Sequence, residues 1–339
     1  MNRAEKRAFV SQDKGKTIDY DGIVRVHPWL IARNLNCILS PDADGFLCGL
    51  LLAKALGWKI RGFFDSKNLL TKEGINPSDC VFLDIEIFRP GIKSIGHHWL
   101  MPGDFKPYRN LGHANAVNPH FYRPIIWDLR RSLMNYFFAK YPFGTVHFLM
   151  GILEGRATYP MPDTALEPLM FADGTYGNIS SYGENCLHWS RFLGADNETC
   201  MLHKVFRSPG VGFFEMAVRM DDFYTLRDGL SAEGIRADRA LKTVFDRLDS
   251  TRGTITLNGA LVDAAENFIK LMGNMTGWHY NRNDWSWSGL TRRSFTKRTE
   301  IPRVGSFNEM FVSRPYPVCW AVTAGNQFEY TLPGPDDLP

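Results

Sequence analysis

The stretch LNCILSPDADGFLCGLLLAKALGWKIRGFFD, residues 35–65, decides the fold class of this chain. Its first six residues form a short apolar run that is typical of a buried strand and ends at Pro41. Residues 42–58 place Asp and Gly at a turn and continue as an almost wholly apolar helix pattern. KIRGFFD, residues 59–65, indicates the next strand. The stretch therefore predicts a strand, a turn, a helix and a second strand, which is the opening of an α/β fold.

Strand and helix patterns continue on both sides of the middle of the chain. CVFLDIE, residues 80–86, and KSIGHH, residues 93–98, indicate further strands at spacings that suit a parallel sheet with crossover helices. Helical patterns then run to about Leu193. Beyond it we predict a strand at 212–220, helices at 236–248 and 261–272, and a terminal strand pair within 318–332.

The length of 339 residues favours two packed domains over one. A Ser-Pro-Gly sequence near residue 209 indicates where a linker would lie. We expect a polar leader at 1–17, a parallel-sheet α/β domain at 18–200, a linker at 201–212, and a smaller α/β (α+β) domain at 213–333.

Composition narrows the class of protein. The net charge of +3 is too small to argue for nucleic-acid binding by itself, because local clustering of Lys and Arg is what matters. The six cysteines show no Cys-x-x-Cys spacing, which fits neither a disulfide framework nor a zinc knuckle and predicts reduced thiols. The polar N-terminus and the absence of a run of ~18 apolar residues predict no membrane segment and a cytoplasmic location.

Polar groups recur where the predicted strands end. Asp42 and Asp44 follow the first strand, Asp84 lies at the end of another, and His97 and His98 follow a third. One such carboxylate can be a helix cap, but ligands of parallel sheets bind at this edge, and here all five groups would meet. Carboxylates and imidazoles without a thiolate suit Mn²⁺, Mg²⁺ or Fe²⁺. The pattern predicts a metal site.

These motifs, in this order and at these spacings, resemble those of the DHH phosphoesterase superfamily. SPDADG looks like the first motif, DCVFLDIE like the second and SIGHH like the third. NAVNPHFYR, residues 115–123, is similar to the Asn-Pro element of RecJ-like members, and HFLMGILEG, residues 147–155, lies where the fourth motif is expected. The resemblance covers about residues 30–160.

The resemblance implies an N-terminal DHH domain that binds two ions, Mn²⁺ or Mg²⁺, and hydrolyses phosphate esters. Two such ions generate a hydroxide at neutral pH, orient the phosphorus and neutralise charge on the leaving oxygen. The implied ligands are Asp42 on one ion, Asp44 on the other, Asp84 bridging both, His97, and Glu154 from the fourth motif.

The implied activity is that of a Mn²⁺-dependent phosphodiesterase acting on single-stranded nucleic acid, short oligonucleotides or nucleotide second messengers. Asp84 and His98 would be catalytic, with His98 beside the phosphate. His120 and Arg123 are candidate phosphate contacts near the cleft, and the second domain would bind the substrate.

The chain departs from the family pattern at Gly96, where the family has an Asp before the paired histidines. Loss of such a supporting carboxylate weakens metal affinity by ~10- to 100-fold. The second half also lacks the Gly-Gly-Gly-His signature of the usual associated domain, and its nearest string is TGWHYN. The alternative is therefore a catalytically degenerate DHH protein that acts as a nucleic-acid-binding or scaffold subunit of a larger complex.

The segment WHYNRNDWSWSGLTRRSFTKR, residues 278–298, combines cations with aromatic rings. Such a composition is typical of a surface that binds single-stranded nucleic acid, where bases stack on the rings. The rings could equally be core residues, or anchors for a protein partner or a second copy of the chain. The candidate substrate contacts in this segment are Arg282, Arg292, Arg293, Trp285 and Trp287.

Overall fold

The computed structural model describes most of the chain. The described residues are 15–99, 115–123, 137–207, 211–248, 253–300, 317–323, 327–333 and 338. The expected leader lies outside them up to residue 14, and Tyr20–Val26 forms the first described helix, α2.

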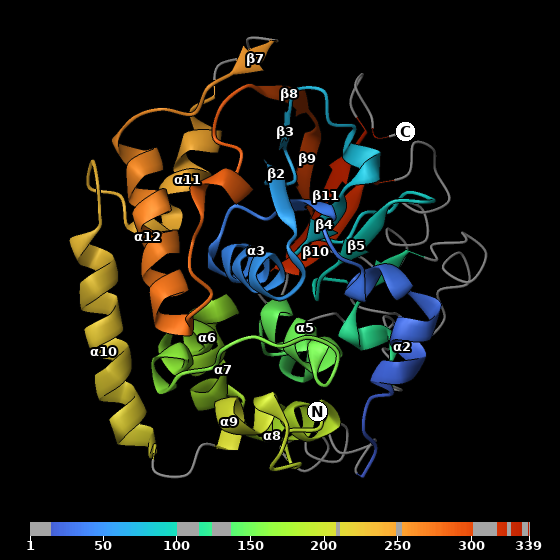
Figure 1. Ribbon diagram of the computed structural model, residues 1–339, viewed down its shortest axis with the longest axis vertical. Coiled ribbons are helices and arrows are strands. Elements are labelled where there is room, and N and C mark those ends of the chain that lie inside the picture. The colour runs from blue at the N-terminus through green and yellow to red at the C-terminus, as the bar shows by residue number, and fades with distance from the viewer. Residues whose placement is uncertain are drawn as a thin grey trace.

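An eight-stranded sheet runs through the molecule in the order β6-β5-β4-β1-β2-β3-β8-β7 (Figure 1). The five strands from β6 to β2 are parallel, and the last three pair antiparallel. The sheet is therefore mostly parallel, as expected. The strands are β1 (Asn36–Leu39), β2 (Lys59–Phe64), β3 (Asn68–Lys72), β4 (Val81–Leu83), β5 (Lys93–Ile95), β6 (Ala116–Val117), β7 (Thr254–Ile255) and β8 (Leu290–Ser294).

The opening strand, helix and strand predicted from the sequence are β1, α3 (Ala43–Leu56) and β2. Alternate residues of β1 face opposite sides of the sheet, as the pleat requires. Cys37 and Leu39 join the large core under the helices, whereas Ile38 joins a smaller core on the other face. Both faces of the sheet are therefore covered, which explains the unbroken apolar run.

Helices cover one face of the sheet. In this helical layer, α3 contacts both β1 and β2 and packs against α5 and α12. Apart from short 3-10 turns, the remaining described helices are α5 (Thr145–Leu153), α6 (Leu166–Phe171), α7 (Thr175–Ser181), α8 (Gly183–Phe192), α9 (Met201–Arg207), α10 (Phe213–Gly229), α11 (Ala237–Asp246) and α12 (Ala260–Thr276).

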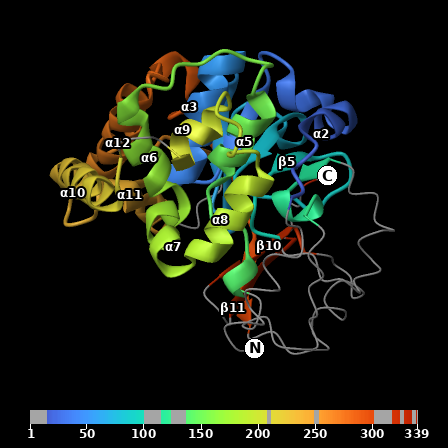
Figure 2. The same ribbon diagram turned by 90° about the horizontal axis from the view of Figure 1, so that it is seen from below.

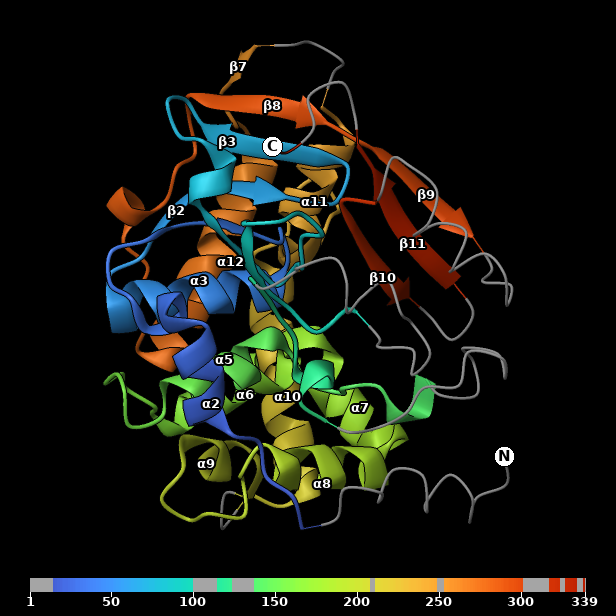
Figure 3. The same ribbon diagram turned by 90° about the vertical axis from the view of Figure 1, so that its right-hand side faces the viewer.

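A smaller antiparallel sheet lies on the other side of the large one, away from α3 and α12 (Figures 2 and 3). Its order is β10-β11-β9, with β9 at Thr296–Glu300, β10 at Cys319–Thr323 and β11 at Gln327–Leu332. Only Phe295 separates β8 from β9, so the chain passes directly from the large sheet into the small one. The expected terminal strand pair is confirmed as β10 and β11.

The second half of the chain builds part of the large sheet. β8 pairs with β3, and one core cluster extends from Ile18 to Leu290 across the expected boundary. The linker expected at 201–212 is wrong over Met201–Arg207, which form α9. Leu202 and Val205 of that helix are buried, which holds it against the core.

The strand predicted at 212–220 is also wrong, because Phe213–Gly229 form the helix α10. Its buried residues include Met216, Met220 and Phe223, and this spacing of three and four is that of a helix face. A dense apolar run such as FFEMAV fits both the helix period of 3.6 residues and the strand period of 2. The sequence pattern alone therefore does not distinguish a helix from a strand here. The helices predicted at 236–248 and 261–272 are confirmed as α11 and α12.

Two expectations from composition can be compared with the structure. All six cysteines are buried and none forms a disulfide. Among the described helices, none is both long enough and apolar enough to cross a lipid bilayer.

Candidate metal centre

The site lies at the carboxyl edge of the parallel strands. Leu39 of β1 aligns with Leu83 of β4, and Leu83 aligns with Ile95 of β5. The residues that follow these strand ends therefore lie next to one another along the edge. The amide of Asp84 continues the ladder by donating to the carbonyl of Ile95 at 2.8 Å.

Asp42 begins the helix that follows β1. Its side chain is the N-cap of α3, where it accepts a hydrogen bond from Gly45 N at 3.1 Å and another from Ser40 Oγ at 2.7 Å. The capping interpretation of this residue is therefore correct. The same carboxylate also lines the cavities on both sides of it.

Asp44, in the first turn of α3, is buried against the N-terminus of α5. Its carboxylate accepts hydrogen bonds from Thr145 N at 2.6 Å and from Val146 N at 3.0 Å. A helix N-terminus favours a negative charge, because its first N–H groups have no partner within the helix. Gly144 makes this approach possible, since a Cβ there would lie 2.6 Å from Asp44 Oδ1.

A hydrogen-bond chain joins Asp84 to His97. Thr145 Oγ1 donates to Asp84 Oδ1 at 2.8 Å and lies 2.8 Å from His97 Nδ1. His97 Nδ1 is also 3.5 Å from Asp84 Oδ1 and 3.8 Å from Asp44 Oδ2. Three strand ends and the start of α5 therefore bring Asp44, Asp84 and His97 together in a buried cluster.

The second histidine of the pair is held by Glu86. His98 Nδ1 lies 3.4 Å from Glu86 Oε2, and the rings of His97 and His98 stack with centroids 4.3 Å apart. Burial acts to lower the pKa of His98, but the contact with Glu86 outweighs it and the pKa is raised. Burial acts to raise the pKa of Glu86, and the contact with His98 lowers it. The contact therefore favours a charged carboxylate on Glu86 and a proton on His98 Nδ1.

The two buried carboxylates are electrostatically unfavourable without a cation. Burial raises the pKa of Asp84 well above its ordinary value, and the nearby Asp44 and Asp42 raise it further. Burial also raises the pKa of Asp44, although His97 opposes it. Among the described residues, no Lys or Arg forms an ion pair with Asp44 or Asp84. A divalent cation would supply the missing positive charge.

The donor set fits a hard divalent metal. Asp84, His97 and His98 each offer one ligand atom within 4.8 Å of the others, so the three could hold an ion. Cys48 Sγ lies 3.9 Å from Asp44 Oδ1, but burial raises the pKa of this thiol well above its ordinary value. The thiol therefore stays protonated, and oxygen and nitrogen are the available ligands.

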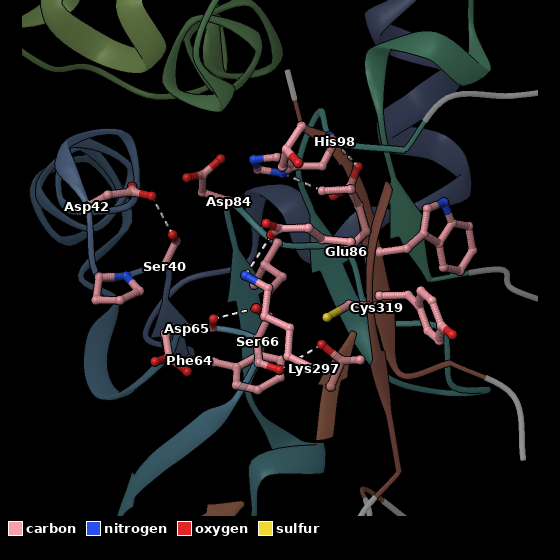
Figure 4. Close-up of a pocket in the computed structure, with 18 of the residues that line it drawn as sticks. Ser40, Asp42, Phe64, Asp65, Ser66, Asp84, Glu86, His98, Lys297 and Cys319 are labelled. Atoms are coloured by element: carbon pink, nitrogen blue, oxygen red, sulfur yellow. Dashed lines mark hydrogen bonds and ion pairs between the residues drawn. The ribbon is translucent and has the colours of Figure 1, made fainter. Parts of the chain in front are cut away.

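Two cavities flank the cluster and meet at Asp42. The first lies between the sheet edge and the small sheet, and it is lined by Asp42, Asp84, Glu86 and His98 (Figure 4). Its volume is about 160 Å³, and it opens to solvent. The second lies toward the helices and is lined by Asp42, Asp44 and Asp173. A ligand in either cavity would reach the carboxylates.

The implied ligand Glu154 does not join the cluster. It follows the last residue of α5, and its carboxylate accepts a hydrogen bond from Met201 N at 2.8 Å. The start of the same nine-residue helix contacts Asp44, so Glu154 lies about 13 Å further along the helix axis. The expectation of a ligand at Glu154 is therefore wrong.

Asp173 is a site residue that the sequence reasoning missed. Its Oδ2 lies 3.1 Å from His97 Nε2, and its backbone is in the left-handed region with φ of 46°. In the sequence it is marked by an Asp-Gly pair, Asp173 and Gly174, which is common in turns and is therefore a weak signal.

His120 and Arg123 are packing residues. His120 is buried, accepts a hydrogen bond from Tyr141 N at 3.2 Å and lies edge-on to Trp189. Burial lowers the pKa of His120 well below its ordinary value. The guanidinium of Arg123 is buried too, 4.2 Å from the centroid of the Trp189 ring. Neither side chain lines the two cavities, so their expected phosphate contacts are wrong.

The tryptophans of residues 278–298 belong to the core. Trp285 and Trp287 are each 5% exposed and stack on one another, with Phe63 packed beside both. Trp287 Nε1 also donates to Tyr280 Oη at 2.8 Å. A base cannot stack on rings whose faces are already covered. The core interpretation is confirmed, and the expected base contacts of these two rings are wrong.

The arginines of that segment have protein partners. Arg282 Nη1 lies 2.8 Å and 2.7 Å from the two carboxylate oxygens of Glu266. Arg292 and Arg293 are on β8, and Arg292 donates to Asn68 Oδ1 through Nε at 2.9 Å and Nη2 at 2.6 Å. None of these arginines lines the two cavities beside the metal centre.

Comparisons with known proteins attach no family to this geometry. No family model matches the chain, and neither a curated protein nor a solved structure matches it.

Proposed function

We propose that this chain is a Mn²⁺-dependent phosphodiesterase whose metal centre is the buried cluster at the sheet edge. The observation that carries the proposal is the convergence of Asp44, Asp84, His97 and His98 from separate parts of the chain. The spacing of the motifs in the sequence did not require these side chains to meet, so their convergence supports the resemblance to DHH phosphoesterases.

The residues have distinct roles in the proposal. Asp44, Asp84, His97 and His98 would hold the metal, and Thr145 fixes the relative positions of Asp84 and His97 through its hydroxyl. Asp42 reaches the cavities on both sides while capping α3. When bound, divalent ions would activate a water molecule and neutralise charge on the phosphate.

Cations beside the cluster support an anionic substrate. Lys242 and Lys297 line the cavity at the small sheet, and Arg236 and Arg239 line the cavity at the helices. The cavity at the helices has a volume of about 410 Å³, which is within the range of small-molecule sites. Because Trp285 and its neighbours are buried, we propose a nucleotide or short oligonucleotide over a long strand stacked on that segment.

Gly96 favours a second candidate, a catalytically degenerate protein that binds nucleic acid or supports a larger complex. The chain lacks a carboxylate at this position, where the resemblance expects one. That candidate predicts nucleotide binding without turnover.

The test is hydrolysis of bis-p-nitrophenyl phosphate, a cyclic dinucleotide and a labelled short oligonucleotide, each with Mn²⁺ and with EDTA. The proposal expects Mn²⁺-dependent cleavage that Asp84→Asn abolishes and Asp79→Asn, at an exposed aspartate, leaves unchanged. Binding of the dinucleotide or oligonucleotide without cleavage of any of the three would favour the degenerate alternative.

A further inference from the structure

Glu86 is a buried carboxylate beside the metal centre. It lies two residues after Asp84 and is 1% exposed. Its Oε1 accepts hydrogen bonds from the amides of His98 at 3.0 Å and Trp99 at 3.1 Å, and from the side-chain amide of Asn118. These three donors fix the orientation of the carboxylate.

The second oxygen of Glu86 faces the ring of His98. Oε2 lies 3.4 Å from Nδ1 of that ring, and both residues line the cavity at the small sheet (Figure 4). Since Nδ1 faces the carboxylate, Nε2 is the ring nitrogen left for a ligand. His98 belongs to the group that could hold a metal ion, together with Asp84 and His97.

Gly96 makes room for this carboxylate. A Cβ at position 96 would lie 2.5 Å from Glu86 Oε2 and 2.7 Å from Glu86 Cδ, closer than real contacts allow. The φ of Gly96 is not in the left-handed region, so the backbone conformation does not require a glycine there. A side chain at position 96 and the carboxylate of Glu86 therefore compete for the same space.

We propose that Glu86 is a positioning residue that holds His98 for the metal and replaces, from the loop after β4, the carboxylate missing at Gly96. Buried carboxylates that hold a metal-binding histidine typically strengthen metal affinity ~10- to 100-fold. The inference rests on the proposed metal centre, and it removes the reason for treating Gly96 as a sign of degeneracy.

A simpler role for Glu86 is to accept the amide hydrogen bonds of His98 and Trp99 without acting on the ring. Glu86→Gln separates the two roles, because an amide oxygen can still accept from these backbone groups. It cannot supply the negative charge beside Nδ1 of His98.

The first experiment is Mn²⁺ titration by calorimetry of the full chain. We expect Glu86→Gln to weaken Mn²⁺ binding about 10- to 100-fold. In the His98→Ala background the same substitution should have no further effect, because Glu86 acts through His98. Glu73→Gln, at an exposed glutamate, is the matched control and should bind as the wild type does.

The second experiment moves the carboxylate. Gly96→Asp alone should weaken Mn²⁺ binding, since its Cβ clashes with Glu86. The double variant Gly96→Asp with Glu86→Ala should bind Mn²⁺ about tenfold more tightly than Glu86→Ala alone. The remaining tight contact of that Cβ, 3.2 Å to Ile85 N, requires only a small backbone shift.

The outcomes separate this inference from the proposed function. If the wild type binds no Mn²⁺, the proposed metal centre fails. If the wild type binds Mn²⁺ and Glu86→Gln binds it equally well, or if Glu86→Gln has the same effect with and without His98, the positioning role fails alone. Circular dichroism of each variant identifies a loss of affinity that comes from misfolding.

Discussion

At the scale of single residues, Asp84 has the most informative backbone. Its φ of 59° lies in the left-handed region, which Asp and Asn adopt more readily than most residues. Such a conformation costs on the order of 1–3 kcal/mol and is concentrated at functional sites. Asp84→Asn can keep this backbone while removing the charge. It is therefore the substitution that separates metal binding from folding.

Gly144→Ala should damage the centre without touching a ligand. The new Cβ would lie 2.6 Å from Asp44 Oδ1 and would push the carboxylate away from the amides of Thr145 and Val146. We expect a loss of about 1–3 kcal/mol in the free energy of unfolding, measured with urea. Gly183→Ala is the control, because a Cβ there meets nothing within 4 Å. Equal stability of the two variants would contradict the crowding at Asp44.

His147 should make the stability of the fold depend on pH. Burial lowers the pKa of this ring to about 4, and its Nδ1 accepts a hydrogen bond from Gly144 N at 3.1 Å. The unfolded chain therefore takes up the proton first as the pH falls from about 6.5 toward 4. Across that window the folded state should lose about 3 kcal/mol from this residue.

The measurement is urea unfolding at several pH values between 4 and 7. His147→Gln should flatten the dependence, whereas His279→Gln, at an exposed histidine, should leave it as in the wild type. An unchanged dependence in His147→Gln would show that the ring does not titrate as its burial requires.

At the scale of elements, α11 borders both cavities. Arg236 is its N-cap residue, and Arg239 and Lys242 follow at intervals of three along the helix. Arg236 and Arg239 share one partner, the buried Asp238, at 3.1 Å and 3.7 Å. Two positive charges opposite one negative charge leave this edge of the helix basic.

Neutralising this edge should weaken substrate capture. For Arg239→Gln combined with Lys242→Gln we expect KM for an oligonucleotide to rise about tenfold at low salt, with little change in kcat. The difference should shrink as salt screens the charges. Arg33→Gln with Lys54→Gln, at exposed residues elsewhere, is the control. A fall in kcat with unchanged KM would contradict the role of α11.

Some elements could be predicted from sequence and others could not. In the run from Leu35 to Asp65 the apolar pattern of each element fits either a strand or a helix, and turn residues separate the elements. Its strands and helix were therefore predicted correctly. The helix α10 was predicted as a strand because the apolar residues at its start fit the spacing of a strand as well as that of a helix. Asp173 was missed because the resemblance placed the fourth motif at HFLMGILEG, where Glu154 is the carboxylate. Only packing shows which end of α5 meets Asp44.

At the scale of the whole molecule, the aromatic residues of the second half join it to the first. Trp285 packs near Phe46 of α3 and Phe63 of β2, with ring centroids 6.4 Å apart in each pair. The sequence showed these rings but not their partners, which lie more than 200 residues earlier. Burial of this kind is decided by tertiary contacts, so the two interpretations of the segment could not be separated from sequence alone.

Trp285→Ala should therefore affect stability and not binding. Removal of a buried tryptophan from a packed core typically costs about 3–5 kcal/mol, and we expect a loss of that size in urea unfolding. Under conditions where the variant remains folded, its affinity for an oligonucleotide should match that of the wild type. A stable variant that no longer binds the oligonucleotide would instead support the interpretation of residues 278–298 as a base-stacking surface.

The molecule as a whole assembles its centre from residues 42 to 173, with Glu86 and His98 at the opening toward the small sheet. Calorimetric titration of Mn²⁺ into the wild type, Asp84→Asn and Asp79→Asn tests this centre most directly. We predict that the wild type and Asp79→Asn bind Mn²⁺ with equal affinity and that Asp84→Asn, although folded, binds none. Absence of binding to the wild type at millimolar Mn²⁺, or equal binding by all three proteins, would contradict a metal centre at this edge of the sheet.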